Sequence, residues 1–204
     1  MTILDKSNRY IQDNIARVNP RHKPVYHLSV PIGWMNDPNG FVYFDNQYHL
    51  FFQYNPYDTQ WGPMHWGHCV SKDLIKWEML PVALAPETDY DKSLGCFSGT
   101  GFSENGKLYL MYTGVIESEE KLVRQQQCLA ESSDGINFRK YAENPVITTE
   151  QVPEGYNKYE FRDPKLFSRD GKYYCLVGTK REKGNDPCEG GEVLLYESMD
   201  MICW

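Results

Sequence analysis

The stretch "SKDLIKW", residues 71–77, decides the fold because it returns twice along the chain. Its echoes are "SSDGINF" at 132–138 and "SMDMICW" at 198–204, which put aspartates at positions 73, 134 and 200. Ser and Asp side chains cap turns by hydrogen-bonding to nearby backbone N–H groups. We therefore expect a side-chain-capped turn in each copy, followed by a Trp or Phe that packs between neighbouring repeats.

A β-hairpin precedes each copy of this element. The hairpin turns are Asp45-Asn46, Asn105-Gly106 and Asp170-Gly171, and each lies between two runs rich in aromatic and apolar residues. Asn-Gly and Asp-Gly are the strongest short hairpin signals. Two markers that repeat in register about every 60 residues indicate the blades of an all-β propeller. The alternative is a β-sandwich with accidental periodicity.

Three repeats do not close a propeller ring, which typically needs about four to eight blades. An open ring would leave one blade face and several strand edges exposed, which is an aggregation hazard. We therefore expect these 204 residues to be a fragment, an incomplete gene product or one piece of a larger assembly.

The composition fits a globular protein that does not bind nucleic acid. Hydrophobic residues make up 41% of the chain and the net charge is −7, whereas nucleic-acid-binding domains are basic. The N-terminus has no apolar run of the signal-peptide type, and no later segment approaches a membrane span. We expect a cytoplasmic protein with no membrane partner, and a helical lead over about residues 8–17; the pattern predicts no oligomeric state.

Neither the cysteines nor the histidines form a metal-ligand pattern. The six cysteines show no CxxC spacing, so we expect buried free thiols. His65 and His68 would point to opposite faces of an alternating strand, which disfavours a shared metal ion. The segment Gly99-Thr100-Gly101 lacks the helix that follows a phosphate-binding loop. We therefore expect no metal and no cofactor.

Polar side chains recur where the first strand of each repeat begins. These starts are Asn36-Asp37-Pro38, Phe97-Ser98-Gly99 and Arg162-Asp163-Pro164. In a propeller the first strands line the central channel, and Pro suits the first residue of a strand because it cannot donate a ladder bond. Asp37 and Asp163 are then expected to converge at one end of the channel. Paired carboxylates catalyse glycoside hydrolysis; two unrelated turn aspartates are the alternative.

The chain resembles, from about residue 24 to its end, the N-terminal part of glycoside hydrolase family 32, the group of invertases, fructanases and sucrose-6-phosphate hydrolases. The motifs that carry the resemblance are "HLS" (27–29), "WMNDPNG" (34–40), "FQYNP" (52–56), "WG" (61–62), "WGH" (66–68), "FSG" (97–99) and "FRDPK" (161–165). The resemblance implies a five-bladed β-propeller followed by a β-sandwich, with about three blades in this chain. It implies a lead segment over 1–23 and the N-terminal part of the catalytic propeller over 24–204.

The family's activity is retaining hydrolysis of β-fructofuranosidic bonds, so the implied partner is a small sugar such as sucrose, sucrose 6-phosphate or a fructo-oligosaccharide. By resemblance, Asp37 is the nucleophile that forms a covalent fructosyl-enzyme, and Asp163 stabilises the transition state with Arg162 beside it. The other residues expected to line the fructose subsite are Asn36, Gln53, Trp61, Phe97 and Ser98. The residue types suit this chemistry, because an arginine favours an ionised carboxylate and amides can both donate to and accept from hydroxyls.

The chain departs from the family at the third catalytic carboxylate, a Glu in a Glu-Cys-Pro type motif on a later strand. Glu189 follows Cys188 in the wrong order, and we expect a loop there. Because a general acid contributes about 10²- to 10⁴-fold in rate, the chain alone is expected to be inactive or nearly so.

Other functions are open on the sequence. They are a non-catalytic carbohydrate-binding propeller and a related hydrolase of the arabinanase or levansucrase type. In the charged loop at 180–184, a contact with a substrate phosphate is the alternative to a solvated hairpin tip.

Overall fold

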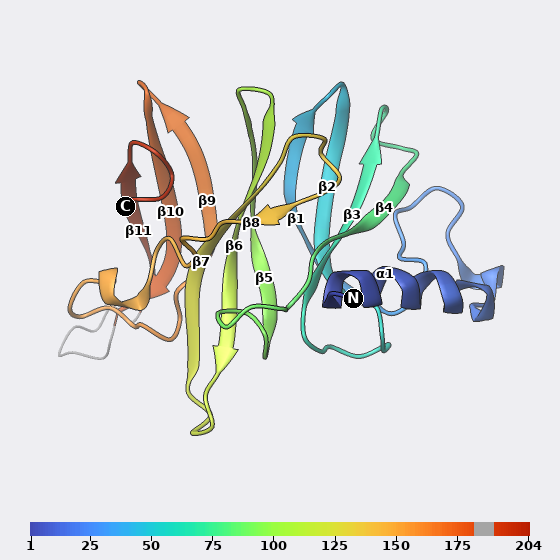
Figure 1. Cartoon of the computed structure of the whole chain (residues 1–204), viewed down its shortest axis with the longest axis horizontal. Helices are drawn as coiled ribbons and strands as arrows, with labels where there is room; N and C mark the ends of the chain where they lie inside the picture. Colours follow the sequence, from blue (N-terminus) through green and yellow to red (C-terminus); the bar gives the residue numbers. More distant parts are fainter. Residues whose placement is uncertain (182–189) are drawn as a thin grey trace.

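The structure, a computed structural model, describes residues 1–181 and 190–204. Within these residues, Figure 1 shows three antiparallel sheets side by side, with a helix, α1 (Ile3–Asn14), next to the first sheet. Blade 1 consists of β1 (Trp34–Phe44), β2 (Gln47–Asn55), β3 (His65–Ser71) and β4 (Glu78–Leu84). Blade 2 consists of β5 (Gly95–Glu104), β6 (Lys107–Glu117), β7 (Val123–Ser132) and β8 (Arg139–Lys140). Blade 3 consists of β9 (Arg162–Arg169), β10 (Lys172–Lys180) and β11 (Gly191–Ser198), and short 3₁₀ turns lie at Ile15–Arg17, Pro20–His22 and Thr149–Gln151.

Each sheet has the strand order of a propeller blade, in which successive strands are neighbours. The first strands of the sheets pack in a row, β1 against β5 and β5 against β9. A parallel bridge joins Met64 of blade 1 to Gly95 of blade 2. The predicted all-β propeller architecture is therefore confirmed, with three blades in the described part of the chain, and β1, β5 and β9 are its inner strands.

The hairpin turns have the predicted type. Both turn residues have positive φ angles, of 44° and 59° at Asp45-Asn46, 51° and 72° at Asn105-Gly106, and 52° and 77° at Asp170-Gly171. Two consecutive positive φ angles are typical of type I′ turns, whose twist matches that of the paired strands. Each of these turns follows an inner strand, and therefore lies at the opposite end of its blade from the start of that strand.

The repeated Ser-Asp element forms the same turn in each described blade. The Asp Oδ1 accepts hydrogen bonds from the backbone N–H groups two and three residues further on, at 2.9 and 2.8 Å each time. The Ser Oγ accepts from the N–H of the aspartate at 3.2–3.3 Å. The residue after the aspartate has a φ between 63° and 70° (Leu74, Gly135 and Met201). The predicted capped turn is confirmed.

The aromatic residue after this turn packs between blades in two of the copies. Phe138 of blade 2 lies edge-on to Phe51 of blade 1, with ring centroids 5.6 Å apart. Trp204 packs into the hydrophobic core shared by blades 2 and 3. Trp77 of blade 1 packs on a cluster that Leu4 and Ile11 of the N-terminal segment also cover. The N-terminal segment therefore covers the face of blade 1 where, in the other copies, a blade lies.

The N-terminal helix begins earlier than the predicted 8–17. Thr2 caps it, because its Oγ1 accepts from the N–H of Asp5 (3.0 Å) while the Asp5 carboxylate accepts from the N–H of Thr2 (2.9 Å). Such a capping box fixes a helix start. Asn8 then ties the helix to β4, since its Oδ1 accepts from the N–H of Val82 (2.8 Å). In the described part of the chain, no helix is both long and apolar enough to cross a membrane.

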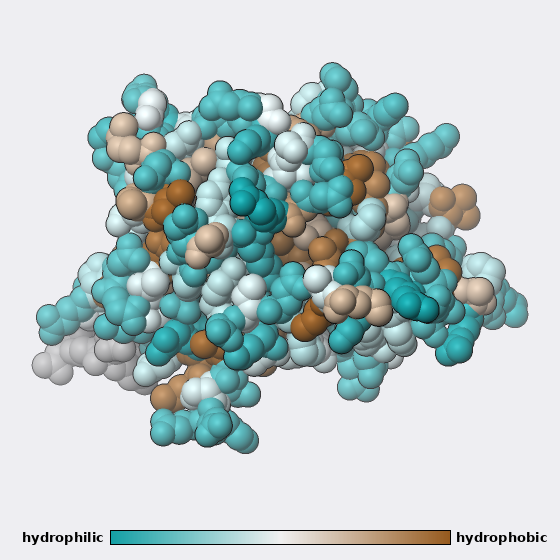
Figure 2. All heavy atoms as spheres, in the orientation of Figure 1, coloured by the Kyte–Doolittle hydropathy of each residue, from teal (hydrophilic) through white to brown (hydrophobic). Residues whose placement is uncertain are grey.

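Packing differs at the two sides of the blade row. Blades 1 and 2 approach so closely that a Cβ at Gly101 would lie 2.3 Å from the carbonyl oxygen of Gly40. On blade 3, by contrast, Val193 and Leu195 of β11 are 62% and 60% exposed. Figure 2 shows hydrophobic surface over the sheet of β9, β10 and β11, at the left of the view. Blade 3 thus presents an uncovered apolar face, of the kind that marks an interaction surface.

The cysteines mostly follow the expectation of buried free thiols, which holds for Cys69, Cys96, Cys128 and Cys175. Cys203 is a correction, because the capped turn of blade 3 leaves it exposed. Cys188 lies outside the described residues.

Candidate active site

The inner strand of each blade carries one extra residue near its start. In blade 1, Asn36 and Asp37 together face one residue of β2. In blade 2, Ser98 is left over between two paired residues of β5, and in blade 3 Asp163 and Pro164 together face one residue of β10. Such β-bulges bend a strand and re-aim its side chains, and they are common next to active sites. Asp37, Ser98 and Asp163 thus lie at equivalent bulges, at the same end of neighbouring strands.

Asp37 and Asp163 are close enough for one charge to affect the other. Burial raises the pKa of Asp163, Arg162 opposes this rise, and the negative charge of Asp37 adds to it. The Asp163 side chain is 62% exposed, so this desolvation is partial. Arg162 thus acts on the pKa of Asp163 in the expected direction, but burial outweighs it. The Nε of Arg162 lies 3.9 Å from its Oδ2, beyond hydrogen-bonding distance.

Blade 2 fixes the backbone on both sides of Asp163. The φ angle of Asp163 is 62°, in the left-handed region that non-glycine residues rarely adopt. Its N–H donates to the Oγ1 of Thr113 (3.2 Å), and the Oγ1 of Thr100 donates to the carbonyl of Pro164 (2.6 Å). These two interblade bonds hold the bulge in a conformation that the isolated strand would not favour.

Two neighbours fix the position of Arg162. Its guanidinium is ion-paired with Glu160 and donates to the Oε1 of Gln125 (3.4 Å). The same Gln125 oxygen accepts from the N–H of Phe161 (2.9 Å), and the Gln125 side chain is buried. The cation beside Asp163 is therefore held by a polar side chain of β7 as well as by its own strand.

Phe97 and Ser98 of blade 2 are tied to blade 1. The Nδ2 of Asn39 donates to the Oγ of Ser98 (3.3 Å), and the indole N–H of Trp66 donates to the carbonyl of Phe97 (3.1 Å). The Phe97 ring meets Trp61 edge to face, with centroids 6.1 Å apart, and 49% of Trp61 is exposed. Trp61 thus offers solvent an aromatic surface braced by a second ring, which suits the apolar face of a sugar.

Asn36 and Gln53 each have a polar partner within the protein. The Oδ1 of Asn36 accepts from the indole N–H of Trp34 (2.7 Å). Gln53 is 3% exposed, and its Nε2 donates to the carbonyl of Cys96 (2.9 Å). A sugar could therefore reach only the remaining amide atoms of these side chains. Their roles in a fructose subsite stay predictions.

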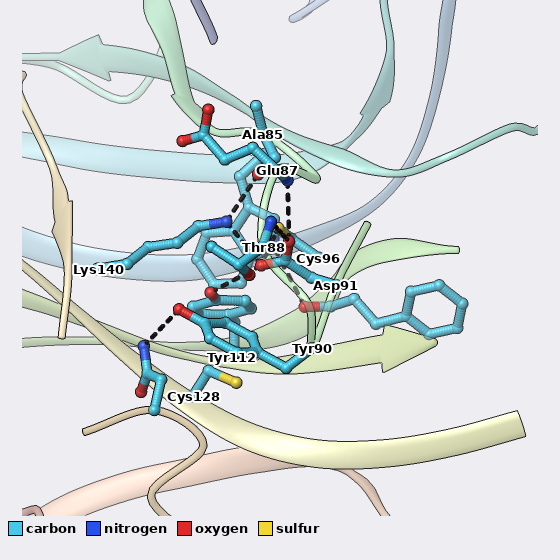
Figure 3. Close-up of polar contacts among 12 residues, drawn as sticks. Ala85, Glu87, Thr88, Tyr90, Asp91, Cys96, Tyr112, Cys128 and Lys140 are labelled. Atoms are coloured by element: carbon cyan, nitrogen blue, oxygen red, sulfur yellow. Dashed lines mark hydrogen bonds and ion pairs between the residues drawn. The ribbon is translucent and has the colours of Figure 1, made fainter. Parts of the chain in front are cut away.

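A buried ion pair adjoins Cys96 at the start of β5 (Figure 3). The Nζ of Lys140, on β8, lies 2.6 Å from the Oδ2 of Asp91, which is in the connection between blades 1 and 2. The same oxygen accepts from the hydroxyl of Tyr112 (3.1 Å) and the thiol of Cys96 (3.7 Å). Burial lowers the pKa of Lys140, but Cys96 and Asp91 raise it by more, so the pKa of Lys140 lies above its usual value. The pair joins the outer strand of blade 2 to the base of its inner strand.

One prediction about local structure is wrong, and two others fall on residues that the structure does not describe. Pro38 is the fifth residue of β1, which begins at Trp34, so it does not start the strand. The bulge explains this position, because bulges tolerate a residue that cannot donate a ladder bond. Glu189 and most of the charged segment 180–184 lie outside the described residues.

The histidines of the "WGH" region take separate partners. The Nδ1 of His65 lies 3.0 Å from the carbonyl of Pro63, and the Nε2 of His68 lies 3.0 Å from the Nδ1 of His49. Within residues 1–181 and 190–204, no cluster of three or more His, Cys, Asp or Glu side chains is arranged to hold a metal ion.

Comparison with known proteins identifies the family of this site. The family described as "Glycosyl hydrolases family 32 N-terminal domain" matches residues 27–204. The chain belongs to glycosyl hydrolase family 32. Among its family 32 relatives, the raffinose invertase of Escherichia coli is 44% identical over 185 residues, which are 89% of this chain and 36% of the relative. The sucrose-6-phosphate hydrolase of Escherichia coli is 42% identical over 201 residues, 95% of this chain and 39% of the relative.

A solved family 32 structure agrees with the fold. The β-fructofuranosidase of Bombyx mori matches with a TM-score of 0.85 and 43% identity, over 99% of this chain and 40% of that one. The chain thus spans well under half the length of each of these relatives.

Four residues that support this family 32 site are not among those predicted from the sequence. They are Thr113, Gln125, Gln127 and Glu160; Gln127 links to Thr113 (2.8 Å) and to the carbonyl of Phe161 (2.9 Å). A signal was present, because the run Gln125-Gln126-Gln127 puts three amides in a row on a strand. Amides that a sheet buries must find hydrogen-bond partners. Glu160 carried no comparable signal.

Proposed function

We propose that this chain carries the nucleophile and the transition-state stabiliser of a retaining β-fructofuranosidase, which acts on sucrose or sucrose 6-phosphate. One observation carries the proposal, namely the equivalent bulges that bring Asp37, Ser98 and Asp163 to one end of adjacent inner strands. The relatives named raffinose invertase and sucrose-6-phosphate hydrolase support a β-fructoside as the substrate.

In this mechanism, Asp37 attacks the anomeric carbon of the fructosyl unit and the glycosidic bond breaks. The electron pair of that bond leaves with the aglycone oxygen, which must take up a proton. Water then attacks the covalent fructosyl-enzyme, so the configuration at the anomeric carbon is retained. Asp37 suits the part of nucleophile because it is exposed.

Asp163 and Arg162 act on the sugar rather than on the bond that is cleaved. The carboxylate of Asp163 accepts hydrogen bonds from ring hydroxyls, and these bonds strengthen as the ring becomes oxocarbenium-like. Trp61 would stack on the sugar, with Phe97 behind it. The interblade bonds of the Asp163 bulge keep this geometry fixed between turnovers, as electrostatic catalysis requires.

The proton donor, in this proposal, comes from outside residues 1–204. Glu160 is the carboxylate next to Arg162, and its ion pair with that arginine leaves it poorly set up to give a proton to a leaving group. A donor on a later strand agrees with the 36–39% of the relatives' length that the chain spans.

We also propose that residues 24–204 are the N-terminal part of the catalytic propeller and that 1–23 are a lead segment. The exposed apolar face at Val193 and Leu195 supports this division, because a further blade would cover it.

The test compares sucrose, sucrose 6-phosphate and an aryl β-fructofuranoside as substrates of the purified chain and its Asp37→Asn variant. An aryl leaving group needs no proton, so the chain should cleave it in an Asp37-dependent way while sucrose reacts about 10²- to 10⁴-fold more slowly. Equal rates on both substrates would show that the acid lies within the chain. Binding of sucrose without cleavage of any substrate would instead favour a non-catalytic carbohydrate-binding propeller.

A further inference from the structure

A groove lies between the β6–β7 hairpin and the segment that leads into β9. Its volume is about 520 Å³, within the range of about 300–1,000 Å³ that is usual for small-molecule sites. We call it the outer groove and define it by Ser118, Leu122, Arg124, Thr149, Lys158 and Tyr159. In Figure 1 the β6–β7 hairpin extends beyond the other strands at the lower end of the view, where the inner strands begin.

One wall of the outer groove is continuous with the active-site strand β9. Tyr159 precedes Arg162 by only three residues. The Oδ1 of Asn157 accepts from the N–H groups of Tyr159 (2.9 Å) and Glu160 (2.8 Å), which fixes the turn that presents Tyr159. The carbonyl of Asn157 in turn accepts from the Oγ1 of Thr179 (3.0 Å) on β10. This wall is therefore an anchored turn.

The opposite wall is also joined to the site. Arg124 directly precedes Gln125, whose Oε1 holds both the N–H of Phe161 and the guanidinium of Arg162. A ligand in the outer groove would thus lie against segments that continue into the residues beside Asp163.

The lining has the chemistry of a site for neutral sugar. Tyr159 and Leu122 are 51% and 49% exposed, and an exposed aromatic ring is a ready surface for the C–H face of a pyranose or furanose. Ser118 supplies a hydroxyl, which can donate to or accept from a sugar hydroxyl.

The charges of the lining balance. Among the described residues that line the groove, Arg124 and Lys158 are cationic, and Glu119 and Glu120 are anionic. A phosphate site gathers cations without nearby carboxylates, so this lining gives a phosphorylated sugar no advantage. Charged side chains of both signs can still hydrogen-bond to the hydroxyls of an uncharged sugar.

We propose that the outer groove binds the distal sugar units of a neutral β-fructo-oligosaccharide, those beyond the one unit next to the bond to be cleaved, with Tyr159 as the stacking residue. The inference rests on the proposed function and narrows its substrate class. The site would bind a tri- or tetrasaccharide better than sucrose, and it would not prefer sucrose 6-phosphate.

The test measures dissociation constants by calorimetry for sucrose, sucrose 6-phosphate and a neutral fructosyl tetrasaccharide. The protein is the Asp37→Asn variant, which prevents turnover, alone and with Tyr159→Ala added. Loss of one stacked ring should weaken tetrasaccharide binding about three- to tenfold and leave sucrose binding unchanged. The matched control is Tyr43→Ala, since Tyr43 is equally exposed, at 55%, but lies at the far end of β1.

Three outcomes would overturn the inference. Tetrasaccharide binding that is unchanged by Tyr159→Ala, or an equal loss of sucrose binding, would mean that Tyr159 does not contact a distal sugar. Sucrose 6-phosphate that binds more tightly than sucrose, in a way that Arg124→Ala abolishes, would mean a phosphate site instead. If no β-fructoside binds to a protein that melts cooperatively, the proposed function fails as well. The first two outcomes, by contrast, would contradict only the outer-groove inference.

Discussion

Replacing Lys140 with methionine removes the charge that balances Asp91 and keeps most of the side-chain volume. Asp91 is fully buried and the Lys140 side chain is only 10% exposed, so water cannot replace the lost partner. Removal of one member of a buried ion pair costs about 3–5 kcal/mol. Asp91 would keep the hydroxyl of Tyr112 and two backbone N–H donors, from Glu87 and Thr88, so we expect a loss near 3 kcal/mol.

The assay is urea unfolding followed by tryptophan fluorescence, with the free energy of unfolding obtained by linear extrapolation. A matched control is at hand, because Lys92 and Asp89 also form an ion pair of 2.6 Å, but with side chains 62% and 94% exposed. Lys92→Met should leave the unfolding midpoint unchanged, since exposed pairs contribute little. The double variant Lys140→Met with Asp91→Asn should regain part of the lost stability. A Lys140→Met midpoint equal to that of Lys92→Met would refute the reasoning.

Two further predictions concern stability. Burial lowers the pKa of His65 to about 4 and that of His68 to about 3. Below about pH 6.5 the unfolded chain therefore binds more protons than the folded protein. The free energy of unfolding should fall by about 4 kcal/mol, for the two histidines together, between pH 8 and pH 5. Urea unfolding midpoints that stay constant over this range would contradict this prediction. Gly101→Ala should lower the melting temperature, because the added Cβ would force blades 1 and 2 apart at Gly40. Gly190→Ala is the control, since its Cβ would meet no described atom within 4 Å and should leave the melting temperature unchanged. Equal melting temperatures of the two variants would count against the close approach of the blades.

Much of the fold could be predicted because its signals are local. The type I′ turns need residues that tolerate positive φ angles, so the pairs Asn-Gly and Asp-Gly predict these turns. The Ser-Asp turn needs a side-chain acceptor at a fixed offset from the N–H groups it caps. Both rules act within four residues, so their repetition was visible without knowledge of tertiary structure. The helix start at Thr2 has an equally local signal, a Thr three residues before Asp5, although the predicted helix began at residue 8.

The candidate site was only partly predictable, because bulges and interblade bonds are not local. The aspartates could be aligned by blade position, but nothing in "FRDPK" reveals a φ of 62° at Asp163. That conformation depends on Thr100 and Thr113 of another blade. The raised pKa of Asp163 likewise depends on its burial and, to a smaller extent, on the charge of Asp37 in another blade. Such features follow from the packed arrangement of strands and not from any one motif.

The most direct test of the central claim is to trap the covalent intermediate. The purified chain is mixed with an aryl β-fructofuranoside, quenched in acid, digested and analysed by mass spectrometry. We predict one fructosyl group on the peptide that contains Asp37. It should be absent from Asp37→Asn and should form, more slowly, in Asp163→Asn. A fructosyl group on Asp163 or on another residue, or aryl release with no adduct and inverted configuration at the anomeric carbon, would contradict it.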